Sequence, residues 1–299
     1  MGPFLMRFQI RDLEQFTGVK AHTIRVWERR YGLLKPDRTD TNIRTYDIDE
    51  LKTILNVAYL NQKGHKISRI AAMPVAERDR AVRQAALEDH GALGILNTLV
   101  MAMLSFDEPL FDGTCDAYAA QHGFRALVED VLVKLLERIG LLWQSNTICP
   151  AQEHFVSNLV RQRLITETAK LPLSNSNSID VLYLPEDEIH ELGLLYVNYL
   201  LRSAGNRTIY LGQSVPGDDL RQVASLYNGP IRFITLVVVR PTADDAPAYL
   251  NALRASMHDP RITFMAAGMP LRGIEASAVP EGMQLFPDLA TLIATVAPR

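Results

Sequence analysis

The spacing of apolar and polar positions divides the chain into three stretches. Between residues 8 and 70, apolar positions recur at helical intervals, and Gly18 interrupts the first such run. A later stretch alternates polar and β-prone residues, as a small hairpin does. The predicted elements are helices over residues 10–16, 21–30 and 48–61 and a hairpin wing over residues 37–46. Residues 1–75 are therefore expected to form a winged helix-turn-helix.

The second stretch, residues 76–171, keeps the helical period and lacks the alternation of a strand. Helices are predicted over residues 78–102, 107–121, 124–143 and 150–170. Pro150 suits the first turn of the last of these helices. This pattern predicts a four-helix bundle. The polar segment that follows, residues 172–178, is poor in helix formers and is expected to be a linker.

Beyond the linker, short apolar and β-prone runs alternate with helix-sized segments. Strands are predicted over residues 179–184, 208–211, 231–239 and 262–266. Such alternation favours a parallel sheet covered by helices on both faces. Residues 179–299 are therefore expected to form a doubly wound, flavodoxin-like α/β domain, and the whole chain to be a multidomain α and α/β protein.

The composition narrows the function. A chain of 299 residues with 47% hydrophobic residues can bury more than one core. No apolar run reaches 18 residues, and no signal peptide is recognised at the N-terminus, so a cytoplasmic protein without a membrane partner is expected. Two cysteines, Cys115 and Cys149, give no disulfide framework. No Gly-x-Ser-x-Gly, His-Glu-x-x-His or Walker sequence occurs, so no catalytic residue is assigned and no enzyme activity is expected.

Charge is distributed unevenly. The net charge of the whole chain is −3, whereas residues 1–75 hold 13 basic and 8 acidic residues, a net charge of +5. A polyanion would bind this basic end. The sequence Thr23-Ile-Arg-Val-Trp-Glu-Arg-Arg-Tyr-Gly-Leu-Leu34, followed by Pro36, Arg38, Asn42, Arg44 and Tyr46, resembles the DNA-binding domain of the MerR family of transcriptional regulators.

The MerR resemblance implies a partner and a contact surface, namely an operator in double-stranded DNA. The second helix would enter the major groove, while the wing would reach phosphates or the adjacent minor groove. Of the candidate residues, Arg25 is expected to make direct DNA contact, and Trp27 is expected to lie in the core. The candidate DNA-binding residues are Lys20, His22, Thr23, Arg25, Arg29, Arg38 and Arg44.

A second motif lies in the α/β segment, where Glu188-x-His190-x-x-Gly193 follows the first predicted strand. Together with Thr235-x-Val237 and Ala267-Gly268 at matching intervals, it resembles the corrinoid-binding domain pattern Asp-x-His-x-x-Gly, Ser-x-Leu and Gly-Gly. The resemblance implies that His190 ligates the cobalt of a cobalamin. Glu188 could hold the other ring nitrogen of His190, and Gly193 would allow close approach. Ala267, in place of a glycine, puts a methyl group where a nucleotide tail would approach.

A third motif lies at the end of the predicted bundle. Trp143, nine residues and Glu153-His154 resemble the Trp-x9-Glu-His pattern of cobalamin-dependent, light-responsive MerR-type repressors of the CarH and LitR kind. In that family the bundle covers the upper face of adenosylcobalamin, which implies that Trp143, Glu153 and His154 hold the adenosyl group. Gln144 stands where light-responsive members have a histidine, and an amide is a poor cobalt ligand. No bis-histidine adduct with residue 144 is expected.

These resemblances predict a repressor whose DNA binding and oligomeric state, dimer or tetramer, depend on adenosylcobalamin and light. The apolar pattern predicts no long coiled-coil helix after residues 1–75. Oligomers are therefore expected to form through the sensor, that is, the bundle and the α/β domain. Two alternatives stay open. The sensor could be a vestigial corrinoid fold controlled by a protein antirepressor or another ligand, or the chain could be a corrinoid carrier for a methyltransferase or mutase.

Overall fold

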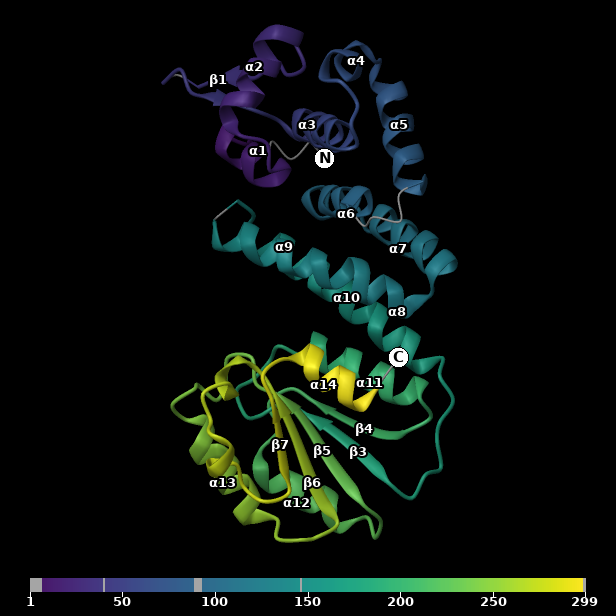
Figure 1. Ribbon diagram of the computed structural model, residues 1–299, viewed down its shortest axis with the longest axis vertical. Coiled ribbons are helices and arrows are strands. Elements are labelled where there is room, and N and C mark those ends of the chain that lie inside the picture. Colours follow the sequence, from purple (N-terminus) through teal and green to yellow (C-terminus); the bar gives the residue numbers. More distant parts are fainter. Residues whose placement is uncertain (1–6, 40, 89–92, 146, 298–299) are drawn as a thin grey trace. The chain divides into compact units, whose positions relative to one another are not determined.

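The computed structural model describes residues 7–39, 41–88, 93–145 and 147–297 (Figure 1). Residues 1–6, part of the segment in which no signal peptide was recognised, lie outside this description. The chain divides into two compact units, residues 1–159 and 160–299, which are taken in turn. In the part of the chain that is described, no helix is both long enough and apolar enough to cross a membrane.

The first unit begins with the expected helix-turn-helix and wing. Its elements are α1 (Ile10–Thr17), α2 (Ala21–Tyr31), β1 (Asp37–Arg38), β2 (Arg44–Thr45), α3 (Ile48–Gln62) and a further short helix, α4 (Ile67–Ala72). Gly18 ends α1 at φ 70°, a left-handed conformation that suits glycine. Asp47 begins α3, where its side chain accepts a hydrogen bond from the Glu50 amide at 2.9 Å. The winged helix-turn-helix is thus confirmed.

A small apolar core holds this head together. Leu13 and Phe16 of α1 and Ile24 of α2 are buried, and α1 packs on both α2 and α3. Trp27 is only 8% exposed, as expected for a core residue rather than a base-stacking one. The buried face of α2 therefore fixes which of its side chains point to solvent.

The remainder of the first unit is helical. It contains α5 (Val75–Glu88), α6 (Leu93–Ser105), α7 (Glu108–His122), α8 (Phe124–Ala126), a π-helical segment (Leu127–Leu132), α9 (Val133–Gln144) and α10 (Pro150–Ala169), the last of which extends into the second unit. The single helix predicted over residues 78–102 is wrong: α5 ends at Glu88 and packs on α3 of the head as well as on α6. The apolar period alone could not place this division, and residues 89–92 of the predicted helix lie outside the described residues.

The second unit contains the end of α10 and a five-stranded parallel sheet. Its elements are β3 (Ile179–Tyr183), α11 (Leu192–Ser203), β4 (Arg207–Gly212), α12 (Gly217–Ser225), β5 (Ile231–Leu236), α13 (Ala246–Ser256), β6 (Ile262–Ala267), β7 (Met283–Phe286) and α14 (Leu289–Val296). The strand order β4-β3-β5-β6-β7 is that of flavodoxin-like folds, which confirms the predicted class. β7 was not predicted, and β5 ends at Leu236 rather than at residue 239.

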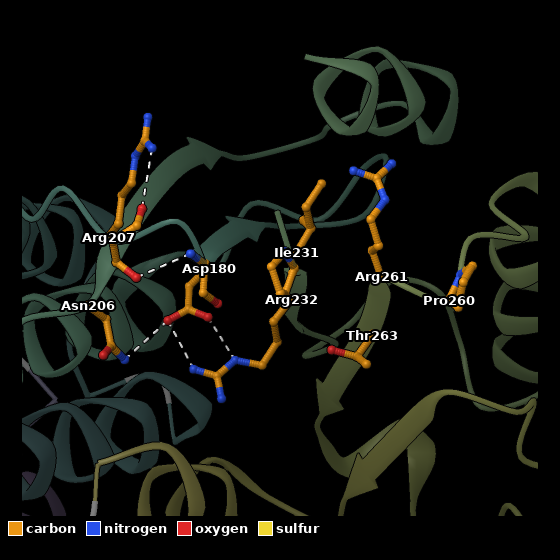
Figure 2. A pocket seen from close by; sticks show the side chains of 11 residues that line it. Asp180, Asn206, Arg207, Ile231, Arg232, Pro260, Arg261 and Thr263 are labelled. Carbon is orange, nitrogen blue, oxygen red and sulfur yellow. Dashed lines mark hydrogen bonds and ion pairs between the residues drawn. The ribbon is translucent and has the colours of Figure 1, made fainter. Parts of the chain in front are cut away.

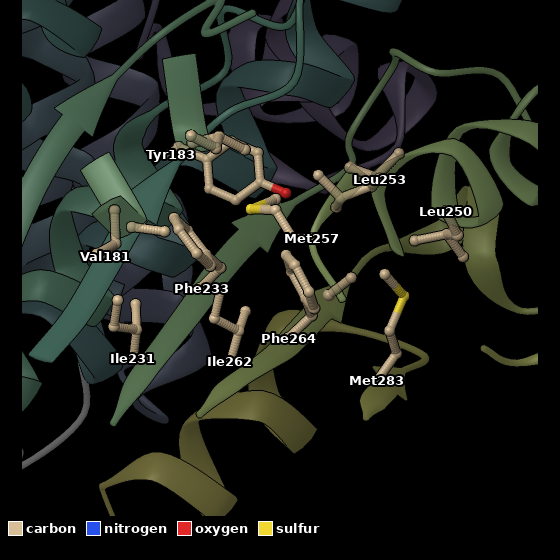
Figure 3. Packing of buried hydrophobic residues seen from close by; sticks show 14 of the residues in the cluster. Val181, Tyr183, Ile231, Phe233, Leu250, Leu253, Met257, Ile262, Phe264 and Met283 are labelled. Carbon is tan, nitrogen blue, oxygen red and sulfur yellow. The ribbon is translucent and has the colours of Figure 1, made fainter. Parts of the chain in front are cut away.

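The sheet is covered on both faces, with α11 and α14 on one side and α12 and α13 on the other (Figure 1). On the α12 and α13 side, aromatic rings from neighbouring strands form the centre of the core (Figure 3). Phe233 stacks on Phe264 with ring centroids 5.4 Å apart, and Tyr183 meets Phe233 edge to face at 6.1 Å. This packing fixes the strand register, and with it the positions of the loops that leave the carboxyl ends of β3, β5 and β6.

Candidate cofactor site and DNA-binding surface

Glu188 joins two of the loops at the carboxyl edge of the sheet. It follows β3, and its side chain is fully buried. Its Oε2 accepts hydrogen bonds from the backbone amides of Val238, Val239 and Arg240 at 3.1, 2.6 and 2.8 Å. Val238 and Val239 belong to the segment that the sequence predicted as the end of a strand, and Arg240 directly follows it. Because β5 stops at Leu236, they are free to turn toward the carboxylate.

The other carboxylate oxygen of Glu188 orients His190. Oε1 accepts from the amides of Ile189 and His190 and lies 2.6 Å from Nδ1 of the His190 ring. The His190 side chain is 53% exposed. A carboxylate can only accept, so Nδ1 carries the proton in this pair and Nε2 keeps a lone pair for a metal. The expected pairing of Glu188 with His190 is therefore present in the structure.

Burial would raise the pKa of Glu188, but the amides of Arg240, Val239 and His190, together with the His190 ring, outweigh it and lower the pKa to about 2. The carboxylate is therefore ionised at any physiological pH. An ionised, immobile acceptor keeps the imidazole in one tautomer and one orientation.

The other motif residues lie at the carboxyl ends of β5 and β6. Val237 is fully buried, and Thr235 is 2% exposed, with no hydrogen-bond partner for its Oγ1 at bonding distance in the described part of the chain. Gly268 has φ 152°, and a Cβ there would overlap the Val237 carbonyl, so only glycine fits. The Ala267 methyl group is buried in the sheet at 1% exposure, so it is not presented at the loop surface.

Gly193 is required by packing inside the unit. A Cβ at this position would lie 2.9 Å from Leu236 Cδ1 and 3.1 Å from Leu289 Cδ2. The glycine therefore lets α11 approach β5 and the start of α14. The structure accounts for this residue without a ligand, whereas the sequence interpretation assigned it to ligand approach.

Apolar side chains are exposed around His190 on the same loops. Ile189 is 60% exposed, Val239 is 51% exposed, and Met269, next to Gly268, is 69% exposed. Exposed apolar groups beside a histidine with a free nitrogen suit a large ring system that carries a metal. The buried Thr235 hydroxyl interacts with Tyr183 beyond hydrogen-bond distance, and it adds a polar group that a ligand atom could bond. The residues present thus fit a corrinoid.

The bundle residues lie in the first unit. Trp143, near the end of α9, is 53% exposed, which is unusual for so large an apolar ring. Glu153 and His154 follow the start of α10, where Glu153 Oε2 lies 2.9 Å from Nδ1 of His154 and Oε1 accepts from Ser157 at 2.6 Å. His154 is 72% exposed. The structure brings Glu153 and His154 together and leaves the indole of Trp143 accessible.

Four of the seven candidate DNA-binding residues line one groove on the head. His22, Arg25 and Arg29 of α2 and Arg44 of β2 line this groove of about 590 Å³. Arg25 and Arg29 are exposed and make no ion pair with any described residue. Together with His22, which is also exposed in this groove, they are available to phosphates or base edges.

Three other candidates are already engaged within the head. Arg44 Nε lies 3.0 Å from Glu28 Oε1, and Lys20 Nζ lies 3.0 Å from Glu14 Oε1. Arg38 donates to the Asn42 side chain at 2.5 Å within the wing. Thr23 is half-buried in the first turn of α2. The Arg44–Glu28 contact fixes the wing against α2, so Arg44 has a structural role that the sequence did not indicate.

A separate cavity of about 590 Å³ lies at the opposite, amino-terminal edge of the sheet. Figure 2 shows that Asp180 receives two hydrogen bonds from Arg232, at 2.8 and 2.9 Å, and one from Asn206 at 3.2 Å. Arg261, also on this edge, is paired with Asp259. Arg207 donates instead to the Ser176 carbonyl and lies over the Tyr227 ring, and none of the motif residues lies here.

Sequence comparison agrees with this arrangement. Residues 8–73 match the MerR HTH family of regulatory proteins, and residues 95–166 match the B12 binding domain family. These two matches define a DNA-binding transcription regulator of the MerR type with a B12-binding domain.

The relatives make the assignment more specific. The chain is 31% identical over 256 residues to the HTH-type transcriptional repressor CarH of Myxococcus xanthus, a match that covers 84% of this chain and 85% of that protein. The repressor CarA of the same organism is 28% identical over 258 residues, covering 84% of this chain and 83% of CarA. The chain belongs to the CarH family of MerR-type transcriptional repressors.

One solved structure supports the fold of the sensor. A monomethylamine corrinoid protein from Methanosarcina barkeri aligns with a TM-score of 0.55 at 17% identity, covering 68% of this chain and 97% of that one. At this identity the likeness concerns the fold alone. It matches the predicted combination of a helical bundle with a doubly wound α/β domain.

Proposed function

We propose that this regulator is a repressor whose operator binding and oligomeric state, dimer or tetramer, are controlled by adenosylcobalamin and by light. The observation that carries the proposal is the Glu188–His190 pair, in which a buried carboxylate fixes one imidazole nitrogen and leaves the other for a metal. When bound, the cofactor supplies a cobalt–carbon bond that light can break.

The candidate residues would contact different parts of the cofactor. His190 would ligate the cobalt, and Glu188 would hold the ring in its metal-binding tautomer. Thr235, Val237, Ala267 and Gly268 would border the space for the nucleotide tail. In the first unit, Trp143 would pack on the adenosyl group through its exposed indole, with Glu153 and His154 beside it.

The first experiment is a visible absorption spectrum. The full chain is incubated with adenosylcobalamin in the dark, gel-filtered, and measured before and after illumination, beside His190→Ala. Retention by the wild type and a lost or altered cobalt spectrum in His190→Ala would support the proposal. A change on illumination would support the light response, and its absence would restrict control to ligand supply.

Loss of cobalamin from the wild type on gel filtration would refute the proposed sensor. The alternative would then be a vestigial corrinoid fold that receives a protein antirepressor or another ligand. Gln144, at the position of the light-exposed histidine, is the feature of this chain that favours control without light. Copurification of a protein with the cofactor-free chain would favour control by a protein antirepressor over a regulator that has no effector.

The DNA surface is tested with Arg25→Gln on an operator selected from random duplexes. Arg25 is exposed in the groove and unpaired, so its loss should weaken binding by about 10- to 100-fold, the range expected for a direct contact. Arg221→Gln is the matched control, because Arg221 belongs to an exposed ion pair with Asp218 on α12. Equal affinities for the two variants would remove Arg25 from the interface.

A further inference from the structure

Glu191, directly after His190, is a second buried carboxylate that the proposed cofactor site does not use. Its side chain is 5% exposed. One oxygen lies 2.5 Å from Arg161 Nε, and the other accepts a hydrogen bond from the Tyr210 hydroxyl at 2.7 Å. Both oxygens are therefore engaged by side chains that come from outside the loop.

The two partners of Glu191 come from different elements. Tyr210 lies on β4, the strand at the edge of the sheet, and Arg161 lies on α10. α10 is the helix that begins at Pro150 and carries Glu153 and His154 in its first turns. The loop between β3 and α11 is thus tied to the segment after β5 by Glu188, and to β4 and α10 by Glu191.

The charges favour this contact strongly. The bond to Glu191 raises the pKa of Arg161, and burial together with the Glu191 carboxylate raises the pKa of Tyr210. Arg161 therefore stays charged and Tyr210 stays a neutral donor. Glu191 has one cationic partner among the described residues, so without Arg161 a buried carboxylate would be left with a hydroxyl alone.

We propose that Arg161 and Glu191 anchor the His190 loop to α10, so that coordination of cobalt by His190 and the packing of α10 depend on each other. This inference rests on the proposed function. Glu188 sets the rotation of the imidazole, whereas Glu191 sets where the loop lies relative to the helix. Arg161 and Glu191 are positioning residues, since neither is required to touch the cofactor.

The physical reason is the narrow tolerance of a metal–nitrogen bond. His190 can bind cobalt only if its loop keeps one position. Partners that orient a metal ligand typically contribute about 10- to 100-fold to metal affinity. Linkage makes the effect reciprocal: if the anchored loop binds the cofactor more tightly, the bound cofactor must stabilise the anchor and therefore α10.

The test compares the wild type, Arg161→Gln and the control Arg221→Gln as full chains. Cobalamin affinity is measured by titration, and nitrogen hyperfine splitting in the reduced, Co(II) form reports whether an imidazole is bound. Hydrogen exchange over residues 160–169 and 186–193 is followed with and without cofactor. Arg161→Gln should bind about 10- to 100-fold more weakly, with a reduced imidazole-bound fraction.

Hydrogen exchange in α10 and in the His190 loop should also depend on Arg161. In the wild type and Arg221→Gln, cobalamin should slow exchange in α10. In Arg161→Gln this slowing should be lost, and the loop should exchange faster even without cofactor. Arg161→Lys, which keeps the charge without the planar fork, should restore part of the imidazole-bound fraction.

The outcomes separate the two proposals. Cobalamin bound through an imidazole in both the wild type and Arg161→Gln, with equal affinity and equal exchange in α10, would overturn the anchor and leave the proposed function standing. A wild type that retains no cobalamin would overturn the proposed function, and the coupling with it. Weak binding in Arg221→Gln to the same degree would show a general charge effect and would also overturn the anchor.

Discussion

Replacing Glu188 with Gln should destabilise the α/β unit as well as the metal site. The carboxylate accepts three backbone amides on one oxygen, from Val238, Val239 and Arg240. It accepts two more amides and the His190 ring on the other. A glutamine keeps the shape but replaces one oxygen with an NH₂ donor. In either orientation that donor faces N–H groups, which leaves buried donors unsatisfied.

The magnitude follows from the pKa of Glu188. Its value of about 2 against an ordinary 4.5 corresponds to about 3 kcal/mol of stabilisation from the ionised form. Because the folded-state pKa is depressed, this contribution is fully present above pH 4.5 and is lost as the pH falls toward 2. At neutral pH we expect Glu188→Gln to lose about 3 kcal/mol. His190→Ala keeps the five amide bonds and should lose about 1 kcal/mol or less.

Hydrogen exchange is the appropriate assay. The amides of Val238, Val239 and Arg240 are bonded to Glu188 itself, so their opening free energy reports the contact directly. Both tryptophans, Trp27 and Trp143, lie in residues 1–159, so an unchanged fluorescence transition provides an internal control. The stability difference between wild type and Glu188→Gln should also shrink between pH 4.5 and pH 2.

Two results would contradict this reasoning. The first is a wild-type exchange rate at residues 238–240 in Glu188→Gln. The second is a loss in His190→Ala as large as that in Glu188→Gln, because the stability would then come from the imidazole rather than from the amides.

Three further predictions concern other parts of the chain. Gly268→Ala should lower the stability of the α/β unit by about 2 kcal/mol or more in thermal unfolding, because the added Cβ would overlap the Val237 carbonyl. Gly273→Ala is the control, and it should change the stability little because the space around Gly273 is open. Gln144→His should give a two-imidazole cobalt spectrum after illumination that the wild type lacks; an identical spectrum in both would show that residue 144 does not reach cobalt. Glu28→Gln should lower head stability by about 1–2 kcal/mol, followed by Trp27 fluorescence, since Glu28 binds both Arg44 and Tyr46; no shift would mean that these bonds contribute little.

The periodic parts of the fold were predictable because they depend on local patterns. The first two helices, the wing and the parallel strands follow from apolar spacing and from breakers such as Gly18. The division of the helix predicted over residues 78–102 was not predictable, since α5 and α6 have the same period but different packing partners. β7 was missed because four residues give too short an alternation to separate from a loop.

The candidate site was also predictable only in part. The sequence named Glu188 and His190, because a carboxylate two residues before a histidine is a local pattern. It missed the amides of residues 238–240, which lie about 50 residues from Glu188 in the chain. It also missed the two partners of Glu191, Arg161 and Tyr210, which lie 30 and 19 residues from it. Glu191 itself was visible as a charged residue beside the histidine, but nothing local showed that it is buried.

By itself, the sequence determined most of the elements, the order of head, bundle and α/β sheet, and the two histidines with their neighbouring carboxylates, because all of these depend on spacings of a few residues. Only the tertiary structure decided which charges are buried and what satisfies them. Burial and partnership depend on chain segments brought together by the sheet order, as when β5 stops at Leu236 and turns three amides onto Glu188. The same long-range packing decided that Arg25 faces solvent while Arg44 is held by Glu28.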